Sequence, residues 1–589
     1  MGYRVYELAK LANVASADVL SYLRDTGEFV RSASSKVSDP VAKAFLDSRG
    51  AAENKPAAPG KVEKLQVVNS HNTWQANPVK VPDHPELLKN IKRLERAFPV
   101  AAEHLQMLRA LGSQFVYADV KYSSDNKPWG TAMVRFSGAI ESAFGLTREV
   151  AFFYFPYGDL QVRQFRQAKE TLSTRKKSDV TPDLAFFFSP DERLTVKLTD
   201  WSKVSFTAIP LPINPGHEPI ELVTLLRDRV YARDLFYETT PVSGERFFGR
   251  QTLLQELRDD IKSHRVSGLF GLRKSGKTSI LYQLRDTLAS ESVIPVFVDL
   301  ESLPSPPQDP TDEFIAEVSQ RIMDEIKVHG VRSGQLERAA KSPSVASFKA
   351  GLSQVLAKLQ EKDIDLVLML DEIEFLTPAD KMDTAEGEWS GVAQVLSILR
   401  AAIQSHENFT FILAGLTNHI LENGRLYGRP NPLFSWAKAR YVGPFSRREA
   451  DDLAKAVGSR MGIEIHEAAL RALYDASGGH AYLYRSLASD VVATLPIDTY
   501  RRVMSNSDVL HALVPWRRSV AGNVAEILNH LKLFYPIESL LISALMASPE
   551  DFEQISRGED MAIHHLLNLG LINSDGNEFE PNLLLELAK

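Results

Sequence analysis

The amino-acid sequence predicts a multidomain α/β protein. At 589 residues the chain is longer than one hydrophobic core usually serves, and three to five domains are expected. Short apolar runs alternate with segments of helical spacing through residues 69–446, which is typical of parallel strands joined by helical crossovers. Residues 447–589 carry mainly helical spacing. We therefore expect two successive α/β units, followed by a helical part.

The composition excludes several classes of protein. The chain has no cysteine, which rules out disulfides, thiolate metal sites and a cysteine nucleophile. No apolar run reaches the roughly eighteen residues of a membrane helix, and the start lacks the charged-then-apolar pattern of a signal peptide. The formal net charge of −7 gives no global reason to bind nucleic acid. We expect a cytoplasmic protein.

Residues 1–48 predict a compact helical unit. Residues 3–12 and 16–24 have helical apolar spacing, and a last short helix is expected over residues 40–46. Arg4-Val-Tyr-Glu-Leu-Ala9 and Ser32-Ala-Ser-Ser35 resemble the N-terminal domain of bacterial translation initiation factor two. That resemblance implies a docking module for a partner protein, RNA or the ribosome, or an adaptor joined to another machine. Residues 49–68 are small, polar and proline-rich, as in a linker.

Residues 69–235 predict a Rossmann-like α/β domain. Helical spacing around residues 85–111 precedes three β-prone runs, and further helical patterns lie between those runs. The runs cover residues 150–155, 184–188 and 204–209. The region lacks a Gly-x-Gly-x-x-Gly fingerprint, so no dinucleotide is expected there.

Two features of this domain leave other functions open. Asp119-Val-Lys121, on an expected strand over residues 115–122, has the spacing of restriction-type metal sites, and Asp83 lies upstream. A surface-exposed polar face of an edge strand explains the same spacing. A basic run on and after one helix offers a place for phosphates or a merely solvated face. It comprises Arg163, Arg166, Lys169, Arg175, Lys176 and Lys177.

A phosphate-binding loop is expected in the second α/β unit, residues 240–446. The apolar run from Val266 leads into Gly271-x-x-x-x-Gly276-Lys277-Thr278, and helical spacing follows over residues 280–288. Strand, glycine loop and helix are the context in which this Walker A pattern is informative. An anion would be surrounded by successive backbone N–H groups and by the start of the helix. Those N–H groups include the ones of Ser275 and Ser279. Lys277 would reach the β- and γ-phosphates, and the Thr278 hydroxyl would ligate Mg²⁺.

A pair of acids completes the expected ATP and Mg²⁺ site. Residues 366–370 are a continuous apolar run, as in a strand buried on both faces, and Asp371-Glu372 follows at its end. Asp371 would hold the Mg²⁺ shell, and Glu372 would take a proton from the attacking water. The alternative is a pair of solvated carboxylates at a strand end.

Polar residues also end the next expected strand, residues 409–415. Thr417 and Asn418 follow it, and ligands bind outside the carboxyl ends of such strands. They are therefore candidate sensors of the γ-phosphate, although turn residues are common there. Arg425, Arg429 and Arg440 are candidate arginine fingers for a neighbouring subunit, or simple salt-bridge residues.

The segments around this unit resemble the AAA-like and STAND classes of P-loop ATPases. Phe247-Phe-Gly-Arg250 resembles their entry motif, which implies that Phe248, Gly249 and Arg250 flank the base. Ser477-Gly-Gly-His480 resembles a Gly-Gly-His-Pro turn of their lids, with Ala481 in place of proline. The resemblance implies an adenine-side contact for His480 and a helical lid over residues 447–510.

Residues 511–589 predict a winged-helix domain. Three helices are expected over residues 536–546, 549–556 and 559–569, and Asp575-Gly576 marks a hairpin. The third helix carries His564 and His565 but no Lys or Arg, which favours contact with protein over DNA. Adjacent helix residues point apart, so the two histidines are not a metal site.

The resemblance to STAND-type ATPases covers residues 245–589 and implies an ATP-dependent molecular switch. Nucleotide-controlled assembly in signalling or antiviral defence is the leading hypothesis, with ATP and ADP as ligands. A homo-oligomer, or a partner protein bound through the N-terminal domain, is expected. A ribosome- or RNA-associated factor and a metal-dependent nuclease remain alternatives, as does a scaffold that binds nucleotide without hydrolysis.

Overall fold

The computed structural model describes residues 84–582, apart from short gaps at 124–125, 176–178, 203–205, 212–218, 290–291, 305–307, 378–388, 499 and 576–577, together with Tyr3, Arg4, Lys36, Val37 and Val41. Chain contacts divide it into two units, residues 1–72 and 73–589. In the first unit, β1 (Tyr3–Arg4) pairs antiparallel with β2 (Lys36–Val37). The helix expected from Tyr3 is wrong at its start, because tyrosine favours strands and this segment finds a pairing partner. The other helices expected there, the linker and most motif residues lie outside the described residues.

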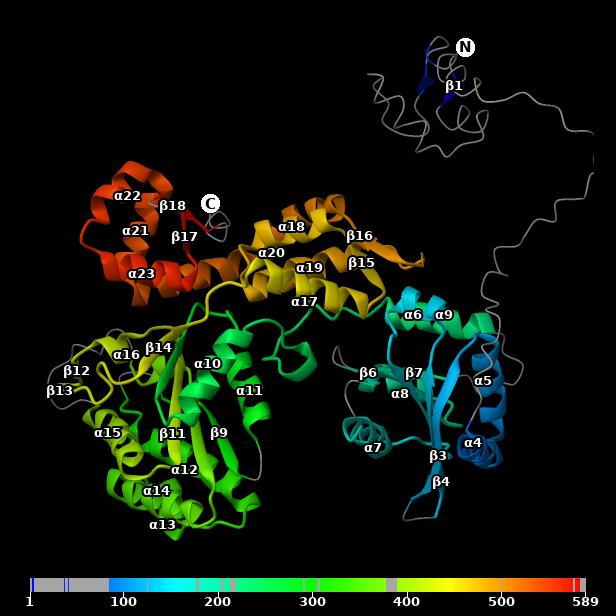
Figure 1. Ribbon diagram of the computed structural model, residues 1–589, viewed down its shortest axis with the longest axis horizontal. Helices are drawn as coiled ribbons and strands as arrows, with labels where there is room; N and C mark the ends of the chain where they lie inside the picture. Colours follow the sequence, from blue (N-terminus) through cyan, green and yellow to red (C-terminus); the bar gives the residue numbers. More distant parts are fainter. Residues whose placement is uncertain are drawn as a thin grey trace, which may run out of the picture. The chain divides into compact units, whose positions relative to one another are not determined.

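Residues 84–235 form a mixed sheet between helices, in the order β3-β4-β5-β6-β7 (Figure 1). The strands are β3 (Gln114–Tyr122), β4 (Pro128–Arg135), β5 (Glu149–Tyr154), β6 (Val180–Phe188) and β7 (Thr207–Pro210). The helices are α4 (Pro85–Ala97), α5 (Pro99–Ala110), α6 (Gly138–Phe144), α7 (Val162–Ser173), α8 (Leu194–Trp201) and α9 (Pro219–Val230). The apolar core on one face lies against α4, α5, α6 and α9, and that on the other against α7 and α8.

The expectation of a parallel, Rossmann-like sheet holds for only half of this domain. β5, β6 and β7 are parallel, as the alternation of strands and helices predicts. β4 runs antiparallel to both β3 and β5, because a short turn near Asn126 folds β3 directly back onto β4. An antiparallel pair needs only a turn, whereas parallel neighbours need a crossover.

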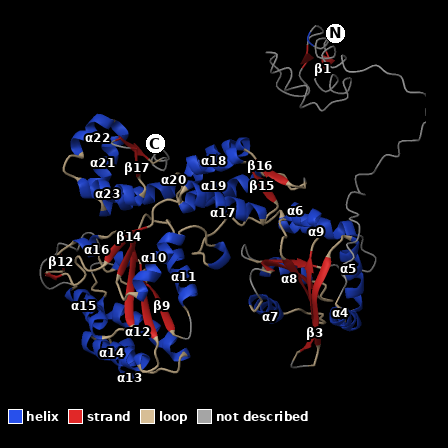
Figure 2. Ribbon diagram, viewed as in Figure 1, coloured by secondary structure: helices blue, strands red, loops and turns tan. Residues whose placement is uncertain are grey.

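The second α/β region is a three-layer structure around a parallel sheet in the order β14-β8-β11-β10-β9 (Figures 1 and 2). Its strands are β8 (Ser267–Phe270), β9 (Val293–Asp299), β10 (Asp365–Asp371), β11 (Phe409–Gly415) and β14 (Lys438–Tyr441). One face packs on α10 (Gln251–Lys262) and α11 (Lys277–Leu288). The other packs on α12 (Thr311–Val328), α13 (Gly334–Lys341), α14 (Val345–Gln360) and α15 (Ser390–Ser405). Smaller elements are η2 (Gly244–Arg246), η3 (Ile373–Phe375), α16 (His419–Glu422), β12 (Arg425–Leu426) and β13 (Arg429–Pro430).

The remaining helices share one hydrophobic core with the sheet tips. They are α17 (Arg447–Ser459), α18 (Glu467–Ser477), α19 (Ala481–Thr494), α20 (Asn506–Phe534), α21 (Pro536–Ala547), α22 (Pro549–Ile555) and α23 (Asp560–Leu569). Short strands accompany them: β15 (Ile463–Ile465), β16 (Arg502–Met504), and the antiparallel hairpin of β17 (Ile572–Asp575) and β18 (Glu578–Pro581). The expected three helices and hairpin are therefore present. α20 crosses the expected boundary at residue 510, so the lid and the last domain are joined by one continuous helix.

None of the described helices is both long enough and apolar enough to cross a membrane.

Candidate functional site

The glycine loop lies between β8 and α11, at the carboxyl end of the first strand of the sheet. Gly276 has a φ of 102°, a conformation that glycine adopts without steric cost, and α11 begins at the next residue. The Lys277 ammonium is buried and donates to the carbonyls of Gly271 and Leu272 at 3.1 and 3.2 Å. The loop therefore holds a buried cation beside the start of a helix, which suits a polyphosphate.

The predicted acid pair lies at the tip of β10, close to this loop. Asp371 is 1% exposed, and the Thr278 hydroxyl is close enough to act on the pKa of its carboxyl. Burial raises the pKa of Asp371 to about 6, against the opposing effects of Thr278 and Lys277. The hydroxyl and the carboxylate thus meet as the predicted Mg²⁺ ligands would. Among the described residues no cluster of three or more histidines or acids could hold a metal, and a carboxylate with substrate phosphates is the usual way Mg²⁺ is bound.

Glu372 turns away from the strand into the cavity. It has a φ of 56° and a ψ of 48°, the left-handed conformation that non-glycine residues seldom adopt. Burial, and then hydrogen bonding to Glu374, raise the pKa of Glu372 to about 8. Glu374 in turn accepts a hydrogen bond from the Leu416 backbone at 3.1 Å. This bond connects the segment after β10 to the end of β11. A buried carboxylate with a raised pKa binds a proton more strongly than an ordinary one, which is the property required of a group that takes a proton from water.

A cavity of about 670 Å³ joins these groups to the lid. Its phosphate end is lined by the loop from Arg273 to Ile280, which includes Ser275, Thr278 and Ser279, and by Glu372. Apolar and aromatic side chains also line the cavity, as is usual for small-molecule sites. These are Phe236, Phe248, Phe445, Leu453 and Tyr482.

The entry motif supports this cavity in a different way from the one expected. Phe248 lines the cavity, and its contact with the base stays a prediction. The Arg250 guanidinium also reaches the wall, but it donates to the carbonyls of Gly443 and Pro444 and stacks on Phe445 at 4.6 Å. Gly249 lies against the Glu449 side chain, which leaves no space for a Cβ. The motif therefore fastens the sheet to the start of the lid.

His480 does not line the cavity. It lies at the start of α19, is 4% exposed, and its Nε2 is 3.1 Å from the Arg273 carbonyl of the glycine loop. Burial lowers the pKa of His480 to about 4, so it is neutral near pH 7. The structure corrects the expected adenine-side contact: His480 joins the lid to the phosphate loop.

The two candidate sensors at the end of β11 also lie outside the cavity wall. Thr417 is fully buried, and its hydroxyl accepts from the His419 backbone at 3.2 Å. The Asn418 amide contacts Glu422, Tyr441 and His565, all within 3.2 Å. Asn418 therefore has partners in α16, β14 and α23, and none of them belongs to the glycine loop.

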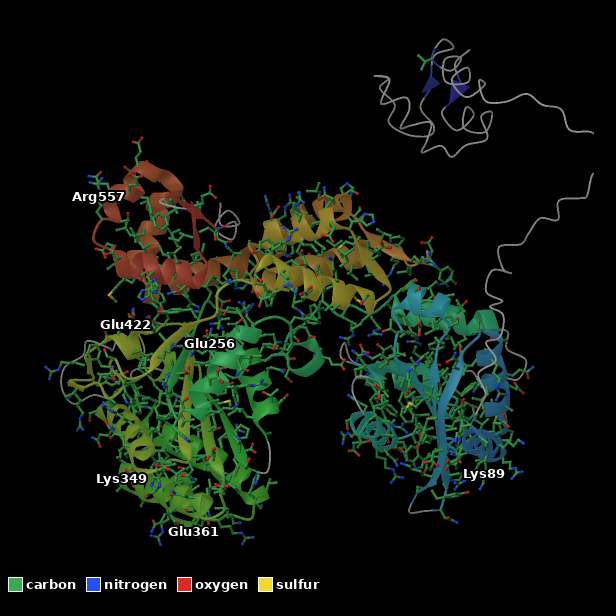
Figure 3. The ribbon with its side chains drawn as sticks, in the orientation of Figure 1. Lys89, Glu256, Lys349, Glu361, Glu422 and Arg557 are labelled. Atoms are coloured by element: carbon green, nitrogen blue, oxygen red, sulfur yellow. The ribbon has the colours of Figure 1, made fainter. Side chains whose placement is uncertain are left out.

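One of the three candidate arginine fingers is buried. The Arg440 guanidinium contacts Asp260 at 2.6–2.7 Å and also pairs with Glu256 (labelled in Figure 3), so it is not exposed as expected. Arg425 donates to the Gly428 carbonyl, and Arg429 is exposed.

The nuclease hypothesis for the middle domain finds no supporting geometry. Asp119 and Lys121 are both on the edge strand β3. The Asp119 carboxylate accepts from the Tyr117 hydroxyl and from the Val120 backbone. The Lys121 ammonium lies over the ring of Trp129 on β4. Asp83, Lys176 and Lys177 lie outside the described residues. In the basic run, Arg175 stacks on Tyr117 at 3.8 Å.

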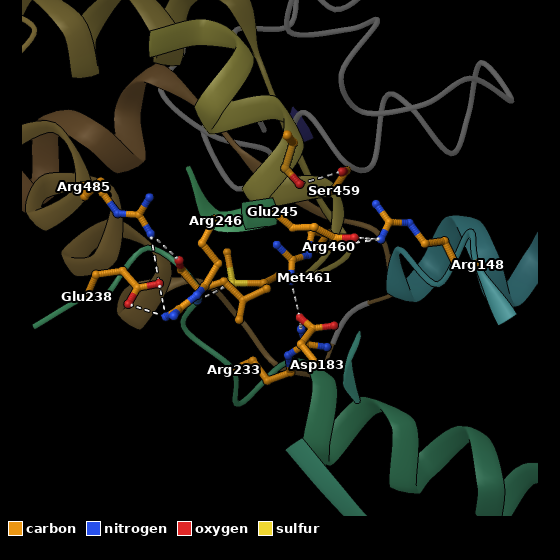
Figure 4. Close-up of polar contacts among 12 residues, drawn as sticks. Arg148, Asp183, Arg233, Glu238, Glu245, Arg246, Ser459, Arg460, Met461 and Arg485 are labelled. Atoms are coloured by element: carbon orange, nitrogen blue, oxygen red, sulfur yellow. Dashed lines mark hydrogen bonds and ion pairs between the residues drawn. The ribbon is translucent and has the colours of Figure 1, made fainter. Parts of the chain in front are cut away.

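Two residues that line the cavity were not expected from the sequence. Glu238 and Arg485 both line the cavity; Arg485 donates to the carbonyls of Leu235 and Phe236 and pairs with Glu238. Glu238 also forms an ion pair with Arg246 (Figure 4). Nearby, two residues of the middle domain form ion pairs with the rest of the chain: Arg148 with Glu245, and Asp183 with Arg460. No short motif marks these residues, because the contacts form only when the lid folds against the segment before the sheet.

A parallel sheet with a glycine loop after β8 and an acid pair at the tip of β10 defines a P-loop module.

Residues 2–51 match the family model "Translation initiation factor IF-2, N-terminal region". The curated initiation factor IF-2 of Cutibacterium acnes is 49% identical over 61 residues, and that of Mycobacterium leprae is 48% identical over 62 residues. These matches cover 10% of the chain and 6% of each relative, so the chain spans only a small part of the length of the relatives it matches.

Solved structures also align with part of the chain. The Walker-type ATPase of Pyrococcus abyssi aligns with 60% of this chain and 99% of its own, at 16% identity and a TM-score of 0.45. The ORC2 protein of Aeropyrum pernix aligns with 60% of this chain and 96% of its own, at 12% identity and a TM-score of 0.38.

Proposed function

We propose that residues 240–582 bind and hydrolyse ATP with Mg²⁺, and that the chain is a STAND-type molecular switch whose assembly is controlled by nucleotide, in signalling or defence. The observation that carries the proposal is the cavity in which Lys277, Thr278 and Glu372 meet apolar and aromatic side chains. Its volume of about 670 Å³ lies within the range of small-molecule sites.

Each residue has a physical role in this proposal. Lys277 and the backbone of the loop hold the β- and γ-phosphates. Mg²⁺, bound by Thr278 and Asp371, would neutralise charge that develops on the phosphates. Glu372 accepts the proton of the attacking water from its buried position. Phe248 and Tyr482 exclude water from the base.

Two substitutions test the site in the full chain. Lys277→Ala should abolish ATP binding measured by calorimetry, whereas Lys349→Ala, an exposed lysine on α14 (Figure 3), should bind normally. Glu372→Gln should keep ATP binding and lose hydrolysis by about 10²-fold or more, as expected for a general base. Its control is Glu361→Gln, also exposed and labelled in Figure 3. Normal hydrolysis by Glu372→Gln would remove Glu372 from this role.

The switch itself is tested by the mass of the particle. Size-exclusion chromatography with light scattering should give a larger assembly with a non-hydrolysable ATP analogue than with ADP or without nucleotide. An identical mass under all three conditions argues against nucleotide-controlled assembly.

A second candidate function is a ribosome- or RNA-associated ATPase. The observation in its favour is the match of residues 2–51 to the N-terminal region of an initiation factor. The full chain should then cosediment with ribosomes, and a chain lacking residues 1–51 should not. Equal sedimentation of both would dismiss this role for the segment.

A further inference from the structure

The glycine loop carries two cations beyond the lysine of its motif, and both contact helix α20. Arg273 Nε lies 3.2 Å from a carboxylate oxygen of Glu526. Lys274 Nζ contacts the Asn523 side-chain oxygen and lies over the Tyr482 ring at 4.5 Å. Asn523 and Glu526 are three residues apart, so they lie on the same face of α20. One face of this helix therefore engages the side chains of the phosphate loop.

α20 is placed to transmit a movement. It runs without a break from Asn506 to Phe534. Near its start the Trp516 indole donates to Ser486 of the lid helix α19. Directly after its end, the Tyr535 hydroxyl bonds to Asn418 at the tip of β11. A movement of α20 relative to the glycine loop would therefore also displace its contacts with the lid and the tip of β11, and the C-terminal helices that follow it.

Arg273 and Glu372, the proposed base, both line the large cavity, and the two are within electrostatic range of each other. Arg273 also lines a small cavity, together with Gly271, Leu272, Ile527 and His530. The ring of His530 is close enough to Arg273 and Glu526 for their charges to act on it. The Arg273–Glu526 pair is therefore next to the expected place of the terminal phosphate.

We propose that α20 is a latch on the phosphate loop, held by Arg273–Glu526 and Lys274–Asn523 and released when the terminal phosphate of a nucleoside triphosphate takes Arg273 from Glu526. The latch rests on the proposed function, since it requires nucleotide in the cavity. Glu526 competes with phosphate for a single guanidinium, and a phosphate accepts two parallel hydrogen bonds from it. ADP lacks the competing group and leaves the latch closed.

The size of the effect follows from the exposure of the pair. The side chains of Arg273 and Glu526 are 41% and 42% exposed. Half-exposed ion pairs couple their partners weakly, so removal of the competing carboxylate should tighten nucleotide binding by about two- to five-fold. Loss of the guanidinium should weaken binding instead, although both changes free the helix.

The test compares these variants of the full chain. Glu526→Gln should bind ATPγS two- to five-fold more tightly than the wild type, Arg273→Gln should bind it more weakly, and both should show faster hydrogen exchange over residues 519–530 without nucleotide. The control Glu553→Gln removes an exposed acid on α22 and should match the wild type. In the wild type, ATPγS should speed exchange in residues 519–530, and ADP should not.

The outcomes separate the latch from the function on which it rests. Unchanged affinity in Glu526→Gln, or unchanged exchange in α20 with ATPγS bound, overturns the latch and leaves ATP binding intact. Absence of ATPγS binding by the wild type overturns both. Opposite changes in affinity with the same change in exchange support the latch, because a purely structural defect would shift both variants in the same direction.

Discussion

At the scale of single residues, His565 illustrates how a buried charge is stabilised. Its Nδ1 lies 2.7 Å from a carboxylate oxygen of Glu538, and its Nε2 lies 3.0 Å from a carboxylate oxygen of Glu422 (labelled in Figure 3). The two carboxylates outweigh the effect of burial and raise the pKa of His565 to about 9. The exposed neighbour His564 has no such partners in the described structure.

The stability of the fold should therefore depend on pH through His565. Its folded pKa is above the unfolded value of about 6.5, so its contribution is complete below that pH and is lost as the pH rises through about 9. His565→Gln should lower the free energy of unfolding by roughly 2–3 kcal/mol at pH 6 and much less at pH 9.5. Thermal unfolding across this range measures it. A parallel shift in the control His564→Gln would contradict the assignment.

The closeness of the glycine loop to the acid pair could be predicted, and the contacts around them could not. Lys277, Thr278 and Asp371 are marked by motifs, because backbone geometry near a phosphate allows few residue types. Asn418 was expected to face the site from its position after a strand. Its side-chain oxygen accepts from the Tyr535 hydroxyl, 117 residues further along the chain, and no local pattern indicates such a partner.

At the scale of elements, Glu449 connects the sheet to the lid. Its carboxylate closes a capping box at the start of α17 by accepting from the Ser446 backbone at 2.9 Å. Its other oxygen accepts from the Arg250 backbone at 2.6 Å, at the start of α10. One side chain therefore accepts from backbone donors at the starts of two helices.

Glu449→Ala should lower the free energy of unfolding by about 1–2 kcal/mol, the usual cost of a lost cap. It should also weaken ATP binding, because Arg250 lies in the wall of the cavity. Urea unfolding and calorimetry measure the two effects. Asp452→Ala, an exposed acid on the same helix, is the control and should change neither. If the free energy of unfolding falls equally in both variants, the Glu449 cap does not stabilise the fold more than an exposed acid on the same helix does.

Strands with continuous apolar runs were predicted well, and their partners less well. β5 and β6 are found within a few residues of the expected runs. β4 was not expected, although it is almost fully buried, because proline and glycine interrupt its sequence Pro128-Trp-Gly-Thr-Ala-Met-Val-Arg135. Burial of β4 depends on helices on both faces, which a local pattern does not reveal.

At the scale of the whole second unit, the middle domain contacts the lid through a close backbone approach. Gly145 ends α6 with a φ of 66°, and a Cβ built there would lie 1.5 Å from the Ser459 carbonyl at the end of α17. Nearby, Asp183 binds both Arg233 and Arg460 (Figure 4). Arg460 is the C-cap of α17, the helix whose other end Glu449 caps. The middle domain is thus linked to the lid over the nucleotide cavity.

Gly145→Ala should therefore loosen this contact without unfolding either domain. The added methyl group meets a backbone carbonyl and forces an unfavourable φ, which together cost about 2–4 kcal/mol unless the domains separate. We expect faster hydrogen exchange in residues 456–462 and a thermal transition that splits into two. Gly138→Ala, at the start of the same helix with open space around its Cβ, is the matched control. A single, unshifted transition in Gly145→Ala would show that the middle domain and the lid do not depend on this approach, and that signals between them travel by another route.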